Sequence, residues 1–427
     1  MSGLTAARVS AVDARATLLV LTVTRWFPVG LTVGITTLLA LERGMSLSQL
    51  GVIFAMQGVV VLGLELPTGG FADALGRRPV LLTAGVVALI SGLVFVTAHT
   101  FRAFVVALLL QGLFRALDSG PLEAWYVDTA QADEPGVRVE ATLAHAGTAL
   151  GLSIASGALV SGALVAWHPF GSMTALELPY WIALGFYAIN VVAIAVRMRE
   201  TRAPVDATRW ARALRSARVA PRTVAAGLRT LSTSRVLRAL VLVEVFWSVG
   251  MIAFETLMPI RLAEVVGGQT SAGALMGPAS AAAWGLFAVG STLAGLVGRR
   301  IGVGWTALLA RVLNGALIVV MGLATGPVGL ITAFLFTYTL HGAGGPAHNT
   351  LLHREADPSN RATVLSMNSM VAGGAYTVGL LALGPLAEHT STALAIVVAG
   401  AFSVLGAALY LPAIHKIGPH SSARAHS

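Results

Sequence analysis

Twelve separate stretches of mainly apolar residues, joined by short polar segments, decide what this chain can fold into. They lie near residues 17–41, 47–71, 79–99, 102–127, 140–166, 175–196, 237–260, 271–297, 304–325, 327–349, 362–387 and 391–413. About 20 apolar residues are enough for a helix to cross the hydrocarbon core of a bilayer. Open strands would leave backbone groups unsatisfied there, so helices are expected. The pattern predicts an all-α polytopic membrane protein with twelve transmembrane helices.

The composition excludes a water-soluble domain of this size. Hydrophobic residues make up 56% of the 427 positions and charged residues only 11%, whereas soluble domains are about a quarter charged. Cysteine is absent, which excludes disulfides and thiolate metal sites.

The basic residues indicate how the chain is oriented. If the N-terminus lies inside, the inner segments hold 22 of the 28 basic residues, and the outer loops hold only Arg43, Arg102 and Arg261. Cytoplasmic loops of membrane proteins are enriched in Lys and Arg. We therefore expect both termini to be cytoplasmic.

A basic segment divides the chain into two halves. The expected organisation is a six-helix bundle over 1–197, a cytoplasmic linker over 198–236, a second six-helix bundle over 237–413 and a cytoplasmic tail over 414–427. The linker has regularly spaced arginines at positions 209, 212, 215, 218 and 222. This spacing favours a basic amphipathic helix on the anionic inner leaflet over a nucleic-acid-binding segment.

A short charged segment joins the second and third apolar stretches. Residues 69–81 read Gly-Gly-Phe-Ala-Asp-Ala-Leu-Gly-Arg-Arg-Pro-Val-Leu. Asp73, Gly76, Arg77 and Arg78 in this spacing resemble the loop between helices 2 and 3 of the major facilitator superfamily. Phenylalanine stands where leucine is usual there, and alanine stands where a basic residue is common. The resemblance implies a secondary transporter and not an enzyme.

The resemblance also implies an architecture and a gating role for this loop. The superfamily consists of two pseudo-symmetric six-helix bundles, with helices 1, 4, 7 and 10 around a central cavity. Its loop braces one transport state, so the expected partner of Asp73 is the helix that begins near Arg361. The sequence Gly298-Arg299-Arg300 repeats the end of the loop 222 residues later, as two related halves would. The residues expected to act in gating are Glu65, Gly69, Asp73, Gly76, Arg77 and Arg78.

Two further motifs narrow the family resemblance. Glu65-Leu66-Pro67-Thr68-Gly69, and Arg115 to Gly120 followed by Glu123-Ala124-Trp125, resemble bacterial drug-efflux transporters of the drug:proton antiporter type. Two departures weaken the match: Leu108 stands where an arginine is often found, and Gly157 to Gly162 lacks the usual proline. Export is favoured over import. A polytopic membrane enzyme or a receptor-like protein remains an alternative, although no H-E-x-x-H, phosphate-binding loop or nucleophile elbow is present.

Charged residues inside the apolar stretches need a function, because each costs about 2.5–3.5 kcal/mol near the bilayer centre. Glu244 would lie about 10 Å from the start of its helix, with no basic residue three or four positions away. Burial favours the protonated form of a carboxyl, as reversible protonation requires. Glu244 is therefore the first candidate for proton coupling, followed by Asp118 and Glu255. Glu255 could instead be an outer residue that touches water.

Polar and aromatic side chains on the expected cavity helices are candidates for substrate contact. They are Arg25, Thr32, Gln111, Arg115, Glu123, Trp247, Met251, Tyr338 and His341. Simpler interpretations stay open: Arg115 could neutralise Asp118 within one helix, Arg25 could form a structural bridge to Asp118, and Glu123 could cap the bundle. Arg311 is expected at the periphery, with its charge reaching the surface.

The expected partners follow from these residues. Acidic and aromatic side chains favour an apolar or cationic amphiphilic small molecule, exchanged for protons across the lipid bilayer. No cofactor, metal or nucleic acid is expected. His341 and His348 are seven residues apart and lack nearby acids, so they favour hydrogen bonding over metal binding. We expect a monomer in the bacterial inner (cytoplasmic) membrane.

Overall fold

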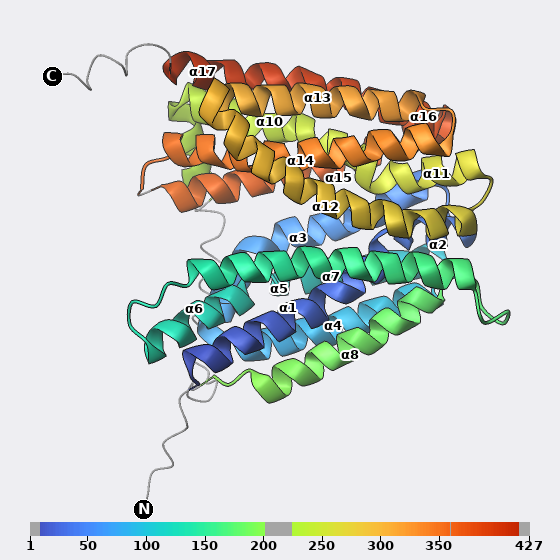
Figure 1. The fold of residues 1–427 in the computed structure, drawn as a ribbon, viewed down its shortest axis with the longest axis horizontal. Helices are drawn as coiled ribbons and strands as arrows, with labels where there is room; N and C mark the ends of the chain where they lie inside the picture. Colours follow the sequence, from blue (N-terminus) through green and yellow to red (C-terminus); the bar gives the residue numbers. More distant parts are fainter. Residues whose placement is uncertain (1–8, 201–223, 359, 418–427) are drawn as a thin grey trace, which may run out of the picture. The chain divides into compact units, whose positions relative to one another are not determined.

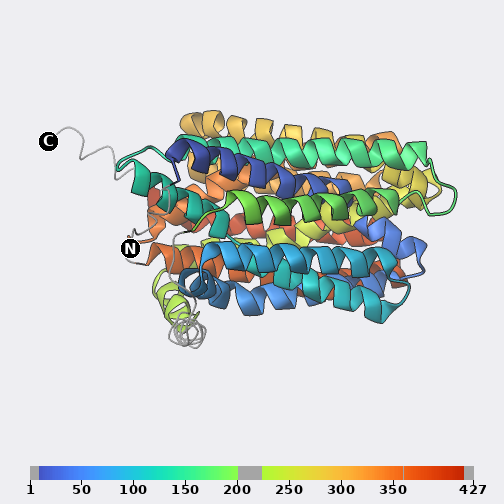
Figure 2. The ribbon, with the colours of Figure 1, turned by 90° about the horizontal axis from the view of Figure 1, so that it is seen from below.

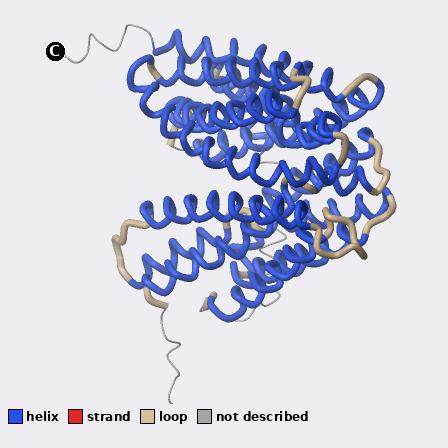
Figure 3. Tube along the Cα trace, turned by 45° about the vertical axis from the view of Figure 1, so that its right-hand side comes forward, coloured by secondary structure: helices blue, strands red, loops and turns tan. Residues whose placement is uncertain are grey.

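The computed structural model describes residues 9–200, 224–358 and 360–417, except for the side chains of residues 65–67, 69, 70, 73, 362 and 417. All regular structure in these residues is helical (Figure 3). Eleven helical stretches within the described ranges are long and apolar enough to cross a membrane. A twelfth, α14 (Pro327–Glu355), has 29 residues and is therefore also long enough to cross. The predicted all-helical membrane fold is confirmed.

Proximity divides the chain into two units, which lie within residues 1–36 and 59–220 for unit 1, and within residues 37–58 and 221–427 for unit 2. The helices of unit 1 are α1 (Ala11–Val33), α4 (Arg77–Thr97), α5 (Phe101–Leu117), α6 (Pro121–Asp133), α7 (Glu140–Trp167) and α8 (Leu178–Arg197). Helix α3 (Leu47–Leu75) begins in unit 2 and ends in unit 1. The expected linker arginines from 209 to 222 lie outside the described residues.

Unit 2 contains the second set of helices (Figure 1). They are α2 (Thr36–Glu42, apart from its first residue), α10 (Arg235–Ile252), the π-helical turn η1 (Ala253–Leu257), α11 (Met258–Val266), α12 (Gln269–Ile301), α13 (Val303–Leu323), α14, α15 (Arg361–His389), α16 (Thr392–Leu405), the 3-10 turn η2 (Gly406–Tyr410) and α17 (Leu411–Ile417). Within each unit the helices run side by side (Figure 2).

The two units have equivalent helix neighbours. In unit 1, α1 packs against α7 and α8, and α4 packs against α5 and α8. In unit 2, α10 packs against α15 and α16, and α13 packs against α14 and α16. Because the helices correspond in chain order, this agreement is what two parallel repeats produce.

Several apolar stretches that look continuous in the sequence are interrupted in the structure, and two of these interruptions hold a candidate acid. Helix α5 ends at Leu117, Asp118 caps it, and Gly120 at φ 89° precedes Pro121, the first residue of α6. In unit 2 the π-helical turn η1 is followed by α11, whose second residue is Pro259. Proline has no N–H to continue the helical ladder, so the wider turn there has a local cause. Each irregularity holds a candidate acid: Asp118 in the first and Glu255 in the second.

Glycine allows the closest helix contact in unit 1. A Cβ atom on Gly30 of α1 would overlap the carbonyl group of Ile154, and one on Gly157 of α7 would overlap that of Phe27. The backbones of α1 and α7 therefore touch, as small residues permit in membrane bundles.

This contact predicts a difference between two glycines of α7. We expect Gly157→Ala to destabilise the protein by about 1–3 kcal/mol, because overpacking forces the backbones apart. A Cβ atom added to Gly151 would meet no other atom within 4 Å, so Gly151→Ala is the matched control and should be neutral or slightly stabilising. Thermal unfolding in detergent measures both. Equal melting temperatures for the two variants would contradict the prediction.

Candidate functional site

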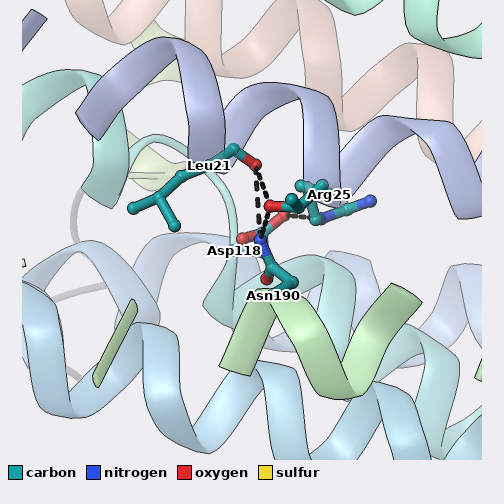
Figure 4. A network of polar contacts seen from close by, with 5 residues as sticks. Leu21, Arg25, Asp118 and Asn190 are labelled. Carbon is teal, nitrogen blue, oxygen red and sulfur yellow. Dashed lines mark hydrogen bonds and ion pairs between the residues drawn. The ribbon is translucent and has the colours of Figure 1, made fainter. Parts of the chain in front are cut away.

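Unit 1 holds a buried ion pair between two helices. The Arg25 Nε atom of α1 lies 2.5 Å from Asp118 Oδ2, at the interruption between α5 and α6. The two side chains are 10% and 18% exposed. Figure 4 shows them facing each other, with Asn190 of α8 close by. The sequence left Arg25 and Arg115 open as partners of Asp118. In the structure the partner is Arg25.

Aromatic and polar neighbours fix the position of Arg25. Its guanidinium carbon lies 4.6 Å from the ring centre of Trp26 and 4.3 Å from that of Phe114, where cation–π attraction stabilises it. The Asn190 amide donates to the Leu21 carbonyl at 3.3 Å and to the Thr24 hydroxyl at 2.8 Å. The charge pair therefore joins α1 to the end of α5, and the Asn190 hydrogen bonds join α1 to α8.

The other unit 1 candidates lie apart from this pair. Arg115 and Glu123 are exposed, and the partner of Asp118 is Arg25 in place of Arg115. Gln111 accepts a hydrogen bond from the Ser91 hydroxyl at 3.1 Å and thereby links α5 to α4. The Thr32 hydroxyl donates to the Pro28 carbonyl of its own helix at 3.2 Å.

Unit 2 holds a second and more deeply buried charge cluster. Glu244 Oε1 of α10 lies 3.0 Å from His348 Nε2 of α14 and 3.9 Å from Arg311 Nη2 of α13. The three side chains are only 5%, 2% and 3% exposed. Tyr410 Oη lies 2.9 Å from His348 Nδ1 and accepts from Arg311 Nε at 3.4 Å. We call Glu244, Arg311, His348 and Tyr410, together with Asn368, the buried ionic cluster.

The geometry indicates where the imidazole carries its hydrogen. His348 Nε2 faces two oxygen acceptors, Glu244 Oε1 at 3.0 Å and Asn368 Oδ1 at 3.2 Å. An ionised carboxylate and an amide oxygen only accept, so Nε2 is the protonated nitrogen, and Nδ1 accepts from Tyr410. In this form the cluster contains one cation and one anion, and its formal charge is zero.

Arg311 corrects an expectation from the sequence. It does not reach the surface; it lies inside unit 2, with its guanidinium carbon 4.3 Å from the ring centre of Trp247. Sequence reasoning also missed Tyr410 and Asn368. One signal was available: Asn314, three residues after Arg311, gives that helix a second polar group on the same face, and it is buried as well.

Next to the buried ionic cluster, α10, α12 and α14 bring together a group of aromatic rings. His341 stacks on Trp247 with ring centres 5.1 Å apart and planes 19° apart. Tyr338 lies 5.9 Å from His341, and its hydroxyl donates to Glu255 Oε1 at 3.4 Å. Glu255 is exposed, and Met251, which precedes it on α10, is half-buried. The substrate-cavity candidates predicted on α10 and α14 are thus neighbours within one unit.

The charged segment of residues 69–81 is helical except at Gly76, which separates α3 from α4, and the start of α4 is held by Glu200, which follows α8. The backbone N–H groups of Arg77 and Arg78 donate to the Glu200 carboxylate at 3.2 and 3.1 Å. Arg77 Nη1 pairs with Asp128 Oδ2 at 2.6 Å. Gly76 has φ 109°, which a residue with a side chain rarely adopts. The side chains of Glu65 and Asp73, and the surroundings of Gly69, lie outside the described residues.

The contact of Glu200 with α4 should contribute to stability. A carboxylate at a helix N-terminus is worth about 0.3–1 kcal/mol and up to ~2 kcal/mol when partly buried. We therefore expect Glu200→Gln to lower the thermal unfolding temperature in detergent. Glu134→Gln removes an exposed carboxylate after α6 and should leave it unchanged. An unchanged unfolding temperature for Glu200→Gln would show that the contact contributes nothing.

Comparisons with known proteins identify the kind of fold. The family described as the Major Facilitator Superfamily matches residues 18–288, more than half of the chain. A search of curated proteins finds no match. Among solved structures, the nucleoside transporter NupG superposes with a TM-score of 0.72 at 14% identity, over 94% of this chain and 99% of that one.

Two other solved structures are similar. A bacterial homologue of the human lysosomal transporter Spinster has a TM-score of 0.73 at 13% identity and covers 94% of this chain and 96% of its own. A bacterial homologue of the human drug peptide transporters PepT1 and PepT2 has a TM-score of 0.68 at 10% identity and covers 95% and 99%. At these identities the likeness concerns the fold.

Proposed function

Since the chain belongs to the major facilitator superfamily, we propose that it is a secondary transporter that exports an apolar or cationic amphiphilic small molecule in exchange for protons. The buried ionic cluster of unit 2 is the observation that carries this proposal. Glu244 is a nearly inaccessible acid on a membrane helix, and its neighbours include the buried cation Arg311. Such intramembrane acids are usually functional.

Glu244 is the proposed proton carrier. In the deprotonated state it is hydrogen-bonded to His348 and lies 3.9 Å from the guanidinium of Arg311. An ion pair at about 4 Å is worth roughly 4 kcal/mol at an effective dielectric of about 20. A proton on Glu244 removes that attraction and gives the cluster a net positive charge. Protonation therefore changes the forces between α10, α13 and α14.

This charge change supports exchange of a cation for protons. A cationic substrate near Trp247 and Tyr338 binds more weakly when the cluster carries a positive charge, and more strongly when the proton has left. Antiport requires that substrate and proton do not bind favourably at the same time, and here both would bind to unit 2. Rocking of the two repeats about a mid-membrane site then moves each in turn.

Asp118 is the proposed second site of charge coupling, through its pair with Arg25. The direction of transport rests on the resemblance of the two acidic motifs to bacterial exporters.

The distribution of arginine supports the proposed location, a bacterial cytoplasmic membrane with both termini inside. We also propose that Asp73 acts in gating. Asp73→Asn should then change the free-energy difference between the inward-facing and outward-facing states by about a few kcal/mol at most.

Transport into proteoliposomes tests the proposal. Purified protein is reconstituted with an imposed pH gradient, and uptake of a fluorescent phenanthridinium cation is followed with and without a protonophore. We expect uptake that collapses when the gradient is discharged. Counterflow of labelled cation at equal pH identifies a carrier. Uptake that is the same with and without the pH gradient, together with counterflow, would identify a uniporter and overturn the proton coupling.

A further inference from the structure

We propose that the aromatic group on α10, α12 and α14 binds a nitrogen-containing heteroaromatic ring that carries a positive charge. The inference rests on the proposed function and narrows its substrate class. The site consists of Trp247, Phe287, Tyr338 and His341, with the Glu255 carboxylate beside them. These residues all belong to unit 2, so the site exists within one repeat.

Three of the rings are only partly covered by the described part of the chain. Trp247, Phe287 and His341 are only half-buried, although Phe287 lies 5.2 Å and Trp247 5.1 Å from His341 between ring centres. Rings that only fill a core are normally buried, as Phe254 and Phe334 are beside them. Half-buried rings around one imidazole give a planar molecule faces on which to stack.

Two ring nitrogens have no hydrogen-bond partner in the part of the chain that the structure describes. Trp247 Nε1 and His341 Nδ1 are both buried, and neither has a hydrogen-bond partner among the described residues. An unsatisfied buried donor is costly, and a ligand that supplies an acceptor recovers that cost. Trp247 Nε1 can only donate. A ring nitrogen with a free lone pair is an acceptor that a stacked aromatic ligand carries in its own plane, whereas a purely hydrocarbon ring offers none.

The charge preference comes from Glu255. Its carboxylate is exposed on the π-helical turn η1 and accepts from the Tyr338 hydroxyl at 3.4 Å. The Tyr338 ring is 5.9 Å from His341, so the negative charge lies at the edge of the aromatic group. Aromatic faces together with a carboxylate favour a cation. An anionic ligand would meet repulsion from Glu255.

The site also lies next to the proposed proton carrier. The Trp247 ring contacts His341 and, 4.3 Å from its centre, the guanidinium of Arg311. Arg311 in turn pairs with Glu244. A ligand on the aromatic group and a proton on Glu244 therefore act on the same tryptophan and arginine.

A pair of probes with fixed charge tests the inference by direct binding. We would measure binding of (quinoxalin-2-ylmethyl)trimethylammonium and (naphthalen-2-ylmethyl)trimethylammonium to the full-length protein in lipid nanodiscs by calorimetry. The two probes have the same shape and charge, and only the first has ring nitrogens. We expect the quinoxaline to bind at least about tenfold more tightly, since polar sites reject analogues without the matching group.

The variants assign this preference to residues. Trp247→Phe and His341→Phe keep an aromatic ring and should each reduce the preference, whereas Glu255→Gln should weaken both probes alike. Trp284→Phe is the matched control: its ring centre is 5.6 Å from Phe287, and its indole nitrogen is not among the unsatisfied atoms. This variant should keep the preference. Thermal unfolding confirms that each variant is folded.

Equal affinities for the two probes, no binding of either probe, or a preference that survives in both Trp247→Phe and His341→Phe would overturn the inference. The proposed function fails by a different observation, namely transport that ignores the pH gradient. Selective binding without proton-driven transport would retain the site and reject the coupling. Proton-driven transport with equal probe affinities would retain the coupling and reject the site.

Discussion

Replacing Glu244 with glutamine is expected to abolish transport driven by a pH gradient and to leave counterflow at equal pH measurable. Glutamine has nearly the same shape and can still accept from His348, but it cannot take up or release a proton. It also fixes the buried ionic cluster in the net positive form that protonation would produce, because Arg311 then has no anionic partner at 3.9 Å. We expect at least about a hundredfold loss of proton-driven uptake.

The measurement needs a control for the loss of a carboxylate elsewhere in unit 2. Asp357→Asn removes an exposed carboxylate of unit 2 and should transport normally. A growth assay against toxic cations gives an independent readout in cells, where Glu244→Gln should confer no protection. If Glu244→Gln retained gradient-driven uptake and protection, the buried ionic cluster would be structural, and Asp118 or Glu255 would become the leading candidate for proton coupling.

Removing Asp118 alone is expected to cost about 3–5 kcal/mol of stability, because it leaves the buried Arg25 without its counter-charge. Asp118→Leu should therefore unfold at a clearly lower temperature in detergent. Replacing both partners, with Arg25→Met and Asp118→Leu, should recover most of the loss, since no buried charge then remains. The contacts of Arg25 with Trp26 and Phe114 make a methionine at this position well packed.

A double-mutant cycle measures the interaction energy between Arg25 and Asp118 separately from their contacts with other residues. A coupling energy of several kcal/mol between the two substitutions is expected, since the charges lie 2.5 Å apart in a buried site. Strictly additive effects would contradict a direct interaction. Arg115→Met, which removes an exposed charge from the same helix that Asp118 caps, should neither destabilise the protein by a comparable amount nor rescue Asp118→Leu.

Local features of the fold could be predicted because they depend on short segments. The twelve apolar stretches agree with the described helices, since apolar length alone decides which segments can span lipid. The interruptions at Asp118 and before Pro259 were not expected. Each depends on one glycine or proline whose effect varies with the packing of neighbouring helices.

Only some residues of the candidate sites could be predicted from the sequence. The sequence singled out Glu244 because an acid inside an apolar stretch is unusual, and it placed Arg25 as one of two partners for Asp118. It did not identify Arg311, which belongs to a different helix 67 residues later in the chain. Helical periodicity relates residues on one helix, whereas the rotation of one helix against another is set by side-chain packing over the whole bundle.

By itself, then, the sequence determined the membrane-spanning helices and the acids that a bilayer would not tolerate without a function, because both follow from the cost of placing polar groups in hydrocarbon. Only the tertiary structure decided the partners of those acids. His348 of α14 meets Glu244, and Tyr410 of η2 meets His348 in turn. Glu200 meets the N-terminus of α4. Such contacts form between distant segments, and their geometry exists only once the helices have packed.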